Sequence, residues 1–262
     1  MQLDGLLRSL TVYAKDFFDR IVVLYCTSTS IHNTSYKLII KEHDGIEFIK
    51  ESWLKKFRKQ LINECMDSNY DYTCFMVDDN MLLDNISEKK EKILENFSAQ
   101  IACFSLRLGL NCDYSHPANK FFKLKNHVVV NSEIIKWNWT EQQVGDFRYP
   151  LATDGHIYRT ENILPLIKNI PFINPNSLEA GLQSFLNTAP PYMMSFSKSH
   201  LVGIPVNLVN TTTLNYFGKT FPYHQDELCK KFLNGYRIDF KKMDFSNIHS
   251  AHQEIKLEFS NK

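Results

Sequence analysis

The sequence has 262 residues, of which 44% are hydrophobic, and its formal net charge is +1. This hydrophobic fraction supports a sizeable core and excludes a disordered chain, while the length fits one large domain or two small ones. The nearly balanced charge gives no reason to expect nucleic acid as a partner. No apolar run approaches the length of a membrane span, and the N-terminus lacks the apolar core of a signal peptide.

The first part of the chain has the pattern of an α/β unit. It opens with a predicted amphipathic helix, indicated by leucines at helical spacing: Leu3, Leu6, Leu7 and Leu10. Residues 19–26 predict a buried strand, residues 57–62 a helix with lysines on its outer face, and residues 70–77 a second strand. Strand, helix and strand in this order predict a right-handed, parallel crossover.

The second of these strands stops abruptly at polar residues. The apolar residues 74–77 are followed by Asp78, Asp79 and Asn80. Carboxylates cannot continue into a dry core, so we expect the strand to end at a surface or cleft. The carboxyl ends of strands form the ligand crevice of open α/β sheets, and clustered oxygen atoms suit a divalent cation that carries a phosphorylated substrate. The same residues also fit an acidic turn with Asn80 in the left-handed conformation.

The six cysteines are scattered along the chain without a Cys-x-x-Cys pair. Their spacing argues against a zinc site and predicts reduced thiols in a cytoplasmic protein. Cys74 and Cys103 stand in apolar runs, where a free cysteine behaves as a small core residue.

The middle and the tail of the chain alternate between predicted strands and helices. A turn signal at Asp154 and Gly155 leads into one of these strands. Trp137 and Trp139 fit either a half-buried position or a place beside a cleft, where such rings stack on sugars. The predicted elements are helices at residues 87–97, 161–170, 178–186 and about 226–235, and strands at residues 101–106, 128–130, 156–159, 206–210 and 251–259.

Glu179 is the second acidic residue of interest. Asn176 or Ser177 can cap a helix that starts at Leu178, which places Glu179 in its first turn. The helix dipole stabilises a carboxylate at this position. Glu179 therefore either faces a cleft or is simply a first-turn helix acid.

These features, taken in order, resemble a nucleotide-sugar glycosyltransferase of the GT-A type, close to the broad family 2 pattern. Residues 77–80 resemble the DxD motif of that family. Residues 154–159 resemble a turn and a following strand that the family also has. Residues 174–179 occupy the place of its acidic acceptor-side motif, and residues 1–10 resemble its first helix. The resemblance extends to about Leu186.

The resemblance implies an α/β, Rossmann-like fold with a mixed, mostly parallel sheet flanked by helices. It implies a single domain over residues 1–262, with a nucleotide-sugar-binding half at 1–110 and an acceptor-binding half at 111–262. The helix at the start of the chain stands where relatives have already passed a nucleotide-binding strand, so we expect that first strand to be missing. A sheet edge would then be exposed.

The expected chemistry is transfer of a sugar from a nucleoside-diphosphate sugar to the hydroxyl of a saccharide or another acceptor, with inversion at the anomeric carbon. A divalent ion, Mn²⁺ or Mg²⁺, would neutralise the leaving diphosphate. The acceptor hydroxyl needs a base, for which we expect Glu179 first and Asp154 second. The expected metal ligands are Asp78, Asp79, Asn80 and His252, with His200 as another candidate histidine. The expected donor contacts are Asp78, Asp79, Asn80 and Arg107. The expected acceptor contacts are Trp137, Trp139, His156 and Arg159.

Two other functions fit the same sequence. Asn80 stands where many relatives have a third acid, and its neutral oxygen attracts a metal more weakly. With the expected loss of the first strand, this fits a non-catalytic carbohydrate-binding or scaffold protein on a similar fold. A nucleotidyltransferase also uses paired acids and Mg²⁺, but it would be favoured by a glycine-rich phosphate loop, which the N-terminal part lacks.

Overall fold

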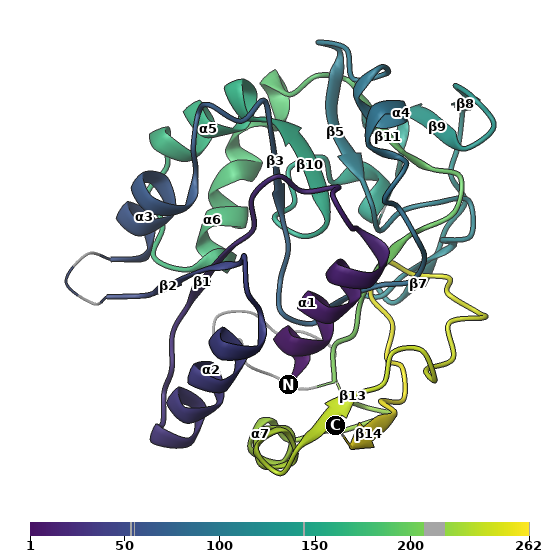
Figure 1. Cartoon of the computed structure of the whole chain (residues 1–262). Helices are drawn as coiled ribbons and strands as arrows, with labels where there is room; N and C mark the ends of the chain where they lie inside the picture. Colours follow the sequence, from purple (N-terminus) through teal and green to yellow (C-terminus); the bar gives the residue numbers. More distant parts are fainter. Residues whose placement is uncertain (53, 55, 144, 207–217, 262) are drawn as a thin grey trace.

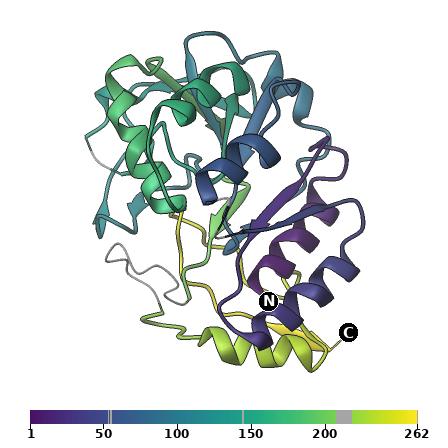
Figure 2. The ribbon, with the colours of Figure 1, turned by 90° about the vertical axis from the view of Figure 1, so that its left-hand side faces the viewer.

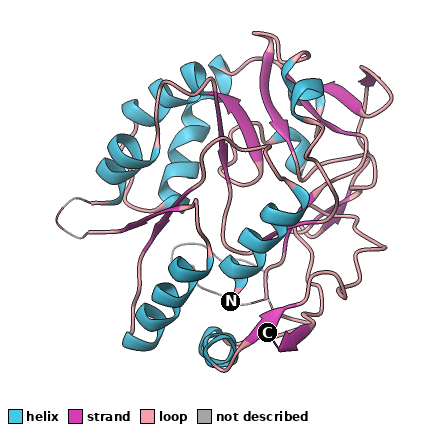
Figure 3. Cartoon of the chain, in the orientation of Figure 1, coloured by secondary structure: helices cyan, strands magenta, loops and turns pink. Residues whose placement is uncertain are grey.

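The computed structural model describes residues 1–52, 54, 56–143, 145–206 and 218–261. Its central element is a six-stranded sheet in the order β3-β10-β5-β11-β9-β8 (Figures 1 and 3). Its strands are β3 (Tyr72–Phe75), β5 (Ile101–Ser105), β8 (His127–Val129), β9 (Ile134–Asn138), β10 (His156–Arg159) and β11 (Tyr192–Phe196). The protein is thus a mixed α/β structure with helices around a largely sheet-based core.

The direction of the strands differs from the prediction. β5 and β11 pair in parallel, whereas every other pair of neighbours in this sheet is antiparallel. The predicted mostly parallel sheet is therefore wrong. The physical reason is long-range pairing: β10 lies between β3 and β5 and runs antiparallel to both, and the residues of β10 themselves do not encode this direction.

A separate parallel pair lies at the other side of the molecule. β1 (Val22–Tyr25) pairs with β2 (Glu47–Lys50) through α2 (Ser30–Glu42), which Thr29 caps by accepting a hydrogen bond from the His32 N–H at 3.3 Å. The crossover predicted between residues 19–26 and 70–77 instead joins β1 to β2. β1 confirms the strand predicted at residues 19–26, whereas the expectation that a strand is missing before the first helix stays a prediction.

The remaining elements surround these sheets. Figure 2 shows α2 beside α7 along one side of the molecule. The described helices are all too short or too polar to cross a membrane. The other helices are α1 (Gln2–Tyr13), α3 (Phe57–Gln60), α4 (Lys90–Leu94), α5 (Thr160–Asn169), α6 (Pro175–Leu182) and α7 (Gln225–Leu233), with short helical turns η1 (Leu61–Cys65), η2 (Trp139–Glu141), η3 (Asp146–Arg148) and η4 (Gln183–Thr188). The minor strands are β4 (Asn80–Leu82), β6 (Tyr114–Ser115), β7 (Lys120–Phe121), β12 (Leu201–Gly203), β13 (Tyr236–Ile238) and β14 (Phe259–Asn261).

The facing edges of β1 and β3 are not paired with each other within the described chain. Val22 and Leu24 on one side and Cys74 and Met76 on the other line a cavity of about 500 Å³ between them. The two sheets are therefore joined by side-chain packing and not by a continuous ladder of hydrogen bonds.

All six cysteines, including Cys74, are free.

The tail of the chain follows the prediction only in part. α7 starts at Gln225, adjacent to Asp226 as predicted, with His224 as its N-cap, and it is followed by Gly235 at a φ of +88°. The strand predicted at residues 251–259 is reduced to a single bridge at His252 and the start of β14. The strand predicted at 206–210 lies, beyond its first residue, outside the described residues.

The predicted N-terminal helix is confirmed as α1, and its leucines join the main core, including Leu7 at 1% exposure. Replacing Leu7 by Ala should lower the free energy of unfolding by about 2–5 kcal/mol, because it leaves a cavity under the helix. Chemical denaturation followed by circular dichroism measures this. Val12→Ala is the matched control at 43% exposure and should change stability by less than about 1 kcal/mol. Equal effects would contradict this packing.

Candidate functional site at the acidic edge of the sheet

The strand register brings two predicted acidic sites to one edge of the central sheet. β10 is antiparallel to β3, and His156 lies opposite Phe75. Asp154 precedes His156 by two residues, and Asp79 follows Phe75 by four. Both aspartates therefore lie just beyond the same edge, although they are distant in the sequence.

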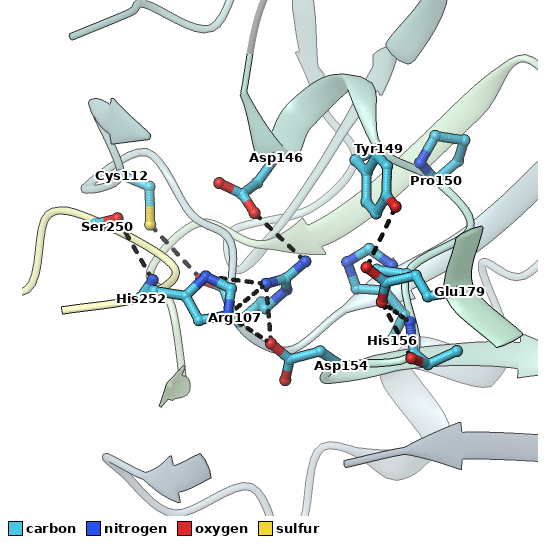
Figure 4. Close-up of polar contacts among 12 residues, drawn as sticks. Arg107, Cys112, Asp146, Tyr149, Pro150, Asp154, His156, Glu179, Ser250 and His252 are labelled. Atoms are coloured by element: carbon cyan, nitrogen blue, oxygen red, sulfur yellow. Dashed lines mark hydrogen bonds and ion pairs between the residues drawn. The ribbon is translucent and has the colours of Figure 1, made fainter. Parts of the chain in front are cut away.

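Two further segments complete this edge (Figure 4). β5 ends at Ser105 opposite His156, which places Arg107 there. Asn80 pairs with Gly203 of β12, and Gly203 forms a bridge with His252. A Cβ atom on Gly203 would lie 2.6 Å from the His252 ring, so the absence of a side chain at this glycine lets the imidazole pack against the strand.

Arg107 is the centre of a buried charge cluster. It is 2% exposed, and its guanidinium nitrogens lie 3.0 Å from Asp154 Oδ2 and 3.4 Å from Asp146 Oδ1. Asp146 is absent from the predicted site residues, because it is an isolated acid in a loop with no motif around it. The donor contact predicted for Arg107 does not fit this placement, since both of its neighbours hold the guanidinium inside the protein.

His252 connects the cluster to a neighbouring cavity. Its Nε2 lies 2.8 Å from Asp154 Oδ2 and 3.3 Å from Arg107 Nη1. Burial acts to lower the pKa of His252, but the hydrogen bond to Asp154 outweighs it and raises that pKa. The Nε2 atom therefore already has a protein partner, and the metal-ligand role predicted for His252 would have to displace Asp154.

The carboxylates of the site differ in their electrostatic state. Burial alone would raise the pKa of Asp154, yet Arg107 and His252 hold it well below its usual range. Burial, and then the negative charges of Asp78 and Asp154, raise the pKa of Asp79 to about 7. The Oδ1 atoms of Asp79 and Asp154 are both buried and have no hydrogen-bond partner within the described chain.

Asp78 lies towards the carboxyl end of β1. Tyr25, the last residue of β1, stacks on Tyr36 of α2 with ring centroids 4.3 Å apart. The pKa of the Tyr36 hydroxyl is raised, first by burial and then by the negative charge of Asp78. The charge of Asp78, three residues beyond the end of β3, therefore acts on a ring that stacks on the last residue of β1. Asn80 does not have a positive φ, so the left-handed turn considered for it is not formed.

Glu179 lies deeper in its helix than predicted. α6 begins at Pro175, with Asn174 as the N-cap, and the Asn174 side chain accepts a hydrogen bond from the Ser177 N–H at 2.8 Å. The predicted cap at Asn176 or Ser177 is therefore wrong. Glu179 belongs to the second turn, where the helix dipole has less influence.

The Glu179 carboxylate points at the segment that carries Asp154 (Figure 4). Its Oε2 accepts hydrogen bonds from the Thr153 N–H at 2.7 Å and the Thr153 hydroxyl at 3.0 Å, and its Oε1 accepts one from the Tyr149 hydroxyl at 3.2 Å. All these donors are neutral. Glu179 is therefore near Asp154, but it is not part of the Arg107 ion cluster.

The aromatic residues predicted to contact an acceptor are buried. Trp137 is 1% exposed, and its indole N–H donates to the Phe147 carbonyl at 2.8 Å. Trp139 is 7% exposed and donates to the Pro190 carbonyl at 2.6 Å. Neither ring has the free face that stacking on a sugar requires.

His156 and Arg159 are held by contacts within the protein. His156 is fully buried, and burial together with Arg107 lowers its pKa to about 3. Arg159 pairs with Tyr72 at the opposite end of β10 and donates to the Phe97 carbonyl. His200, the other histidine considered as a metal ligand, packs on Phe196 and contacts the Lys198 carbonyl.

The described residues contain no group of three or more His, Cys, Asp or Glu side chains arranged to hold a metal ion. Mg²⁺ is commonly bound through one or two carboxylates together with substrate phosphates and water, and does not need such a cage. The unpartnered Oδ1 atoms of Asp79 and Asp154 fit this kind of substrate-borne cation.

Comparison with known proteins adds one relationship. No family model matches the chain. The chain is 29% identical over 184 residues to the bifunctional glycosyltransferase pgtA of Dictyostelium discoideum, in a match that covers 64% of this chain and 24% of that protein. The chain thus spans about a quarter of the length of that relative. The similarity supports a glycosyltransferase-like protein.

Removing the Arg107 charge should destabilise the fold. Arg107→Met leaves the buried Asp154 and Asp146 without their cation, so we expect the free energy of unfolding to fall by about 3–5 kcal/mol. Arg148→Met is the control, because Arg148 is exposed close to Asp146, and it should change stability by less than about 0.5 kcal/mol. Urea denaturation measures both. A stable Arg107→Met protein would show that the cluster does not hold this edge together.

Proposed function

We propose that this protein is a glycosyltransferase with a GT-A-like fold that transfers a sugar from a nucleoside-diphosphate sugar to an acceptor hydroxyl. The observation that carries the proposal is the position of Asp78 and Asp79 just beyond the end of β3, beside the cluster of Asp154, Arg107 and His252. The relationship to pgtA supports glycosyl transfer in general. The halves at residues 1–110 and 111–262 would bind donor and acceptor respectively.

The donor diphosphate would bind at the acidic edge together with Mg²⁺ or Mn²⁺. Asp79 is the main candidate to hold the ion, because its buried Oδ1 has no partner within the described chain, and Asp78 stands beside it. The chemistry that such an ion supplies when bound is neutralisation of the charge on the leaving diphosphate. The side-chain oxygen of Asn80 instead accepts a hydrogen bond from the Val77 N–H at 3.1 Å, and this bond shapes the turn.

Of the two predicted bases, Glu179 fits better than Asp154. Arg107 and His252 hold the pKa of Asp154 well below the usual range of an aspartate. Its carboxylate is therefore a weak proton acceptor. Glu179 receives hydrogen bonds only from the neutral groups of Tyr149 and Thr153 among the described residues. A base on the opposite side of the anomeric carbon from the diphosphate would give inversion.

The first test of this function is donor binding. Calorimetry with several nucleoside-diphosphate sugars should show binding that requires Mn²⁺ or Mg²⁺. Asp79→Asn should weaken it about a hundredfold, since a charged ligand to the ion is lost. Asp84→Asn, an exposed aspartate a few residues further along, should leave it unchanged. Unaltered binding by Asp79→Asn, or no donor binding at all, would refute the assignment; the latter would favour a non-catalytic scaffold.

A second test separates the base role of Glu179 from its structural role. Glu179→Gln can keep the hydrogen bonds to Thr153 and Tyr149, yet it cannot accept a proton. Transfer should fall about a hundredfold or more while donor affinity changes little. Tyr149→Phe removes one of the same hydrogen bonds but keeps the carboxylate, and it should retain transfer within about tenfold. Similar transfer rates for Glu179→Gln and the parent would rule out this base.

A further inference from the structure

A cavity of about 250 Å³ lies against His252. Three separate segments build it, around residues 114–119, 219–220 and 249–254. Drug-sized ligands occupy pockets of about 300–1,000 Å³, so this cavity suits a smaller molecule of about one ring. Nothing in the sequence pattern indicated it, because the segments meet only in the folded chain.

One wall of the cavity is aromatic. The ring centroids of Tyr114 and His249 are 5.5 Å apart, and those of Phe121 and His249 are 6.3 Å apart with the rings nearly parallel. The Tyr114 hydroxyl donates to Asn119 Oδ1, which fixes the ring. Tyr114 is only half-buried, so part of its ring is accessible from the cavity. Such a ring packs well against the apolar face of a sugar.

The lining also offers a fixed hydrogen-bond acceptor. The Glu254 carboxylate accepts backbone N–H groups from Lys219 at 2.8 Å, Thr220 at 2.7 Å and Phe221 at 3.2 Å. Burial acts to raise the pKa of Glu254, but these backbone hydrogen bonds lower it, so the group stays ionised. A carboxylate has about four acceptor positions, which leaves one for a ligand hydroxyl.

The charge of the cavity argues for an uncharged ligand. Its lining includes one carboxylate, Glu254, and one ammonium group, Lys219. Of its histidines, His249 and His252 lie 3.4 Å and 2.8 Å from the carboxylates of Asp113 and Asp154, and burial lowers the pKa of His116. There is therefore no excess of positive charge to attract a phosphate. His252 lies at the boundary with the acidic edge, since it lines the cavity and also contacts Asp154 at 2.8 Å.

We infer that this cavity binds one saccharide ring of the acceptor, with the apolar face of the ring on Tyr114 and a hydroxyl on Glu254. The inference rests on the proposed function, and it replaces the buried Trp137 and Trp139 as the acceptor contacts. The ligand would sit beside His252, next to the acidic edge where the donor is proposed to bind.

The test is titration of the full chain with the methyl glycosides of glucose, galactose, mannose and N-acetylglucosamine, followed by ligand-observed NMR. At least one should bind in the millimolar range. Tyr114→Ala should weaken that binding about tenfold, because the stacking face is lost, whereas Tyr114→Phe should stay within about threefold of the parent. The control is Tyr236→Ala, a tyrosine of β13 with 39% exposure that lies outside this cavity, and it should bind as the parent does.

The outcomes separate this inference from the proposed function. If nucleoside-diphosphate sugars bind but no methyl glycoside does, or if Tyr114→Ala binds a glycoside as well as the parent, the saccharide site is overturned and the glycosyltransferase stands. Tyr114-dependent glycoside binding without any donor binding would keep the site and overturn the enzyme. Thermal unfolding of each variant checks the fold, and loss of binding in Tyr114→Ala counts only if Tyr114→Phe retains it.

Discussion

The acidic edge depends on one buried cation. Arg107 is 2% exposed and lies between Asp154 and Asp146, which come from segments far from it in the sequence. Two carboxylates at this depth would be strongly destabilising without a cation between them. The ion cluster therefore fixes the loop before β10 against the end of β5, and it holds Asp154 next to Asp79.

This cluster also gives the acidic groups different states. Asp154 is held ionised by Arg107 and His252, whereas burial and neighbouring carboxylates raise the pKa of Asp79; each keeps one buried oxygen without a partner in the described chain. Glu179 is kept apart from the cluster by the neutral donors of Thr153 and Tyr149. Environments that separate similar groups in this way are typical of sites where each group has its own task.

Local patterns in the sequence predicted the elements but not their neighbours. The leucine repeat of α1 and the strand that ends before Asp78 could be predicted, because apolar spacing and the cost of burying a carboxylate act within a few residues. The direction of β10 could not, since it depends on long-range pairing with β3 and β5. The sequence leaves Trp137 open between a half-buried position and a ligand contact, because exposure is not encoded in residue type, and the structure buries it. Asp146 carries no local signal and is recognised only beside Arg107 in space.

The most direct measurement of the central claim is a crystal structure of the protein grown with Mn²⁺ and a nucleoside diphosphate, with the metal located by its anomalous scattering. The account predicts manganese within ligand distance of the Asp79 carboxylate, bridging it to the diphosphate, with the nucleoside near the end of β1. Manganese and nucleotide bound elsewhere, such as in the cavity between β1 and β3, or an acidic edge without metal at saturating nucleotide, would contradict it.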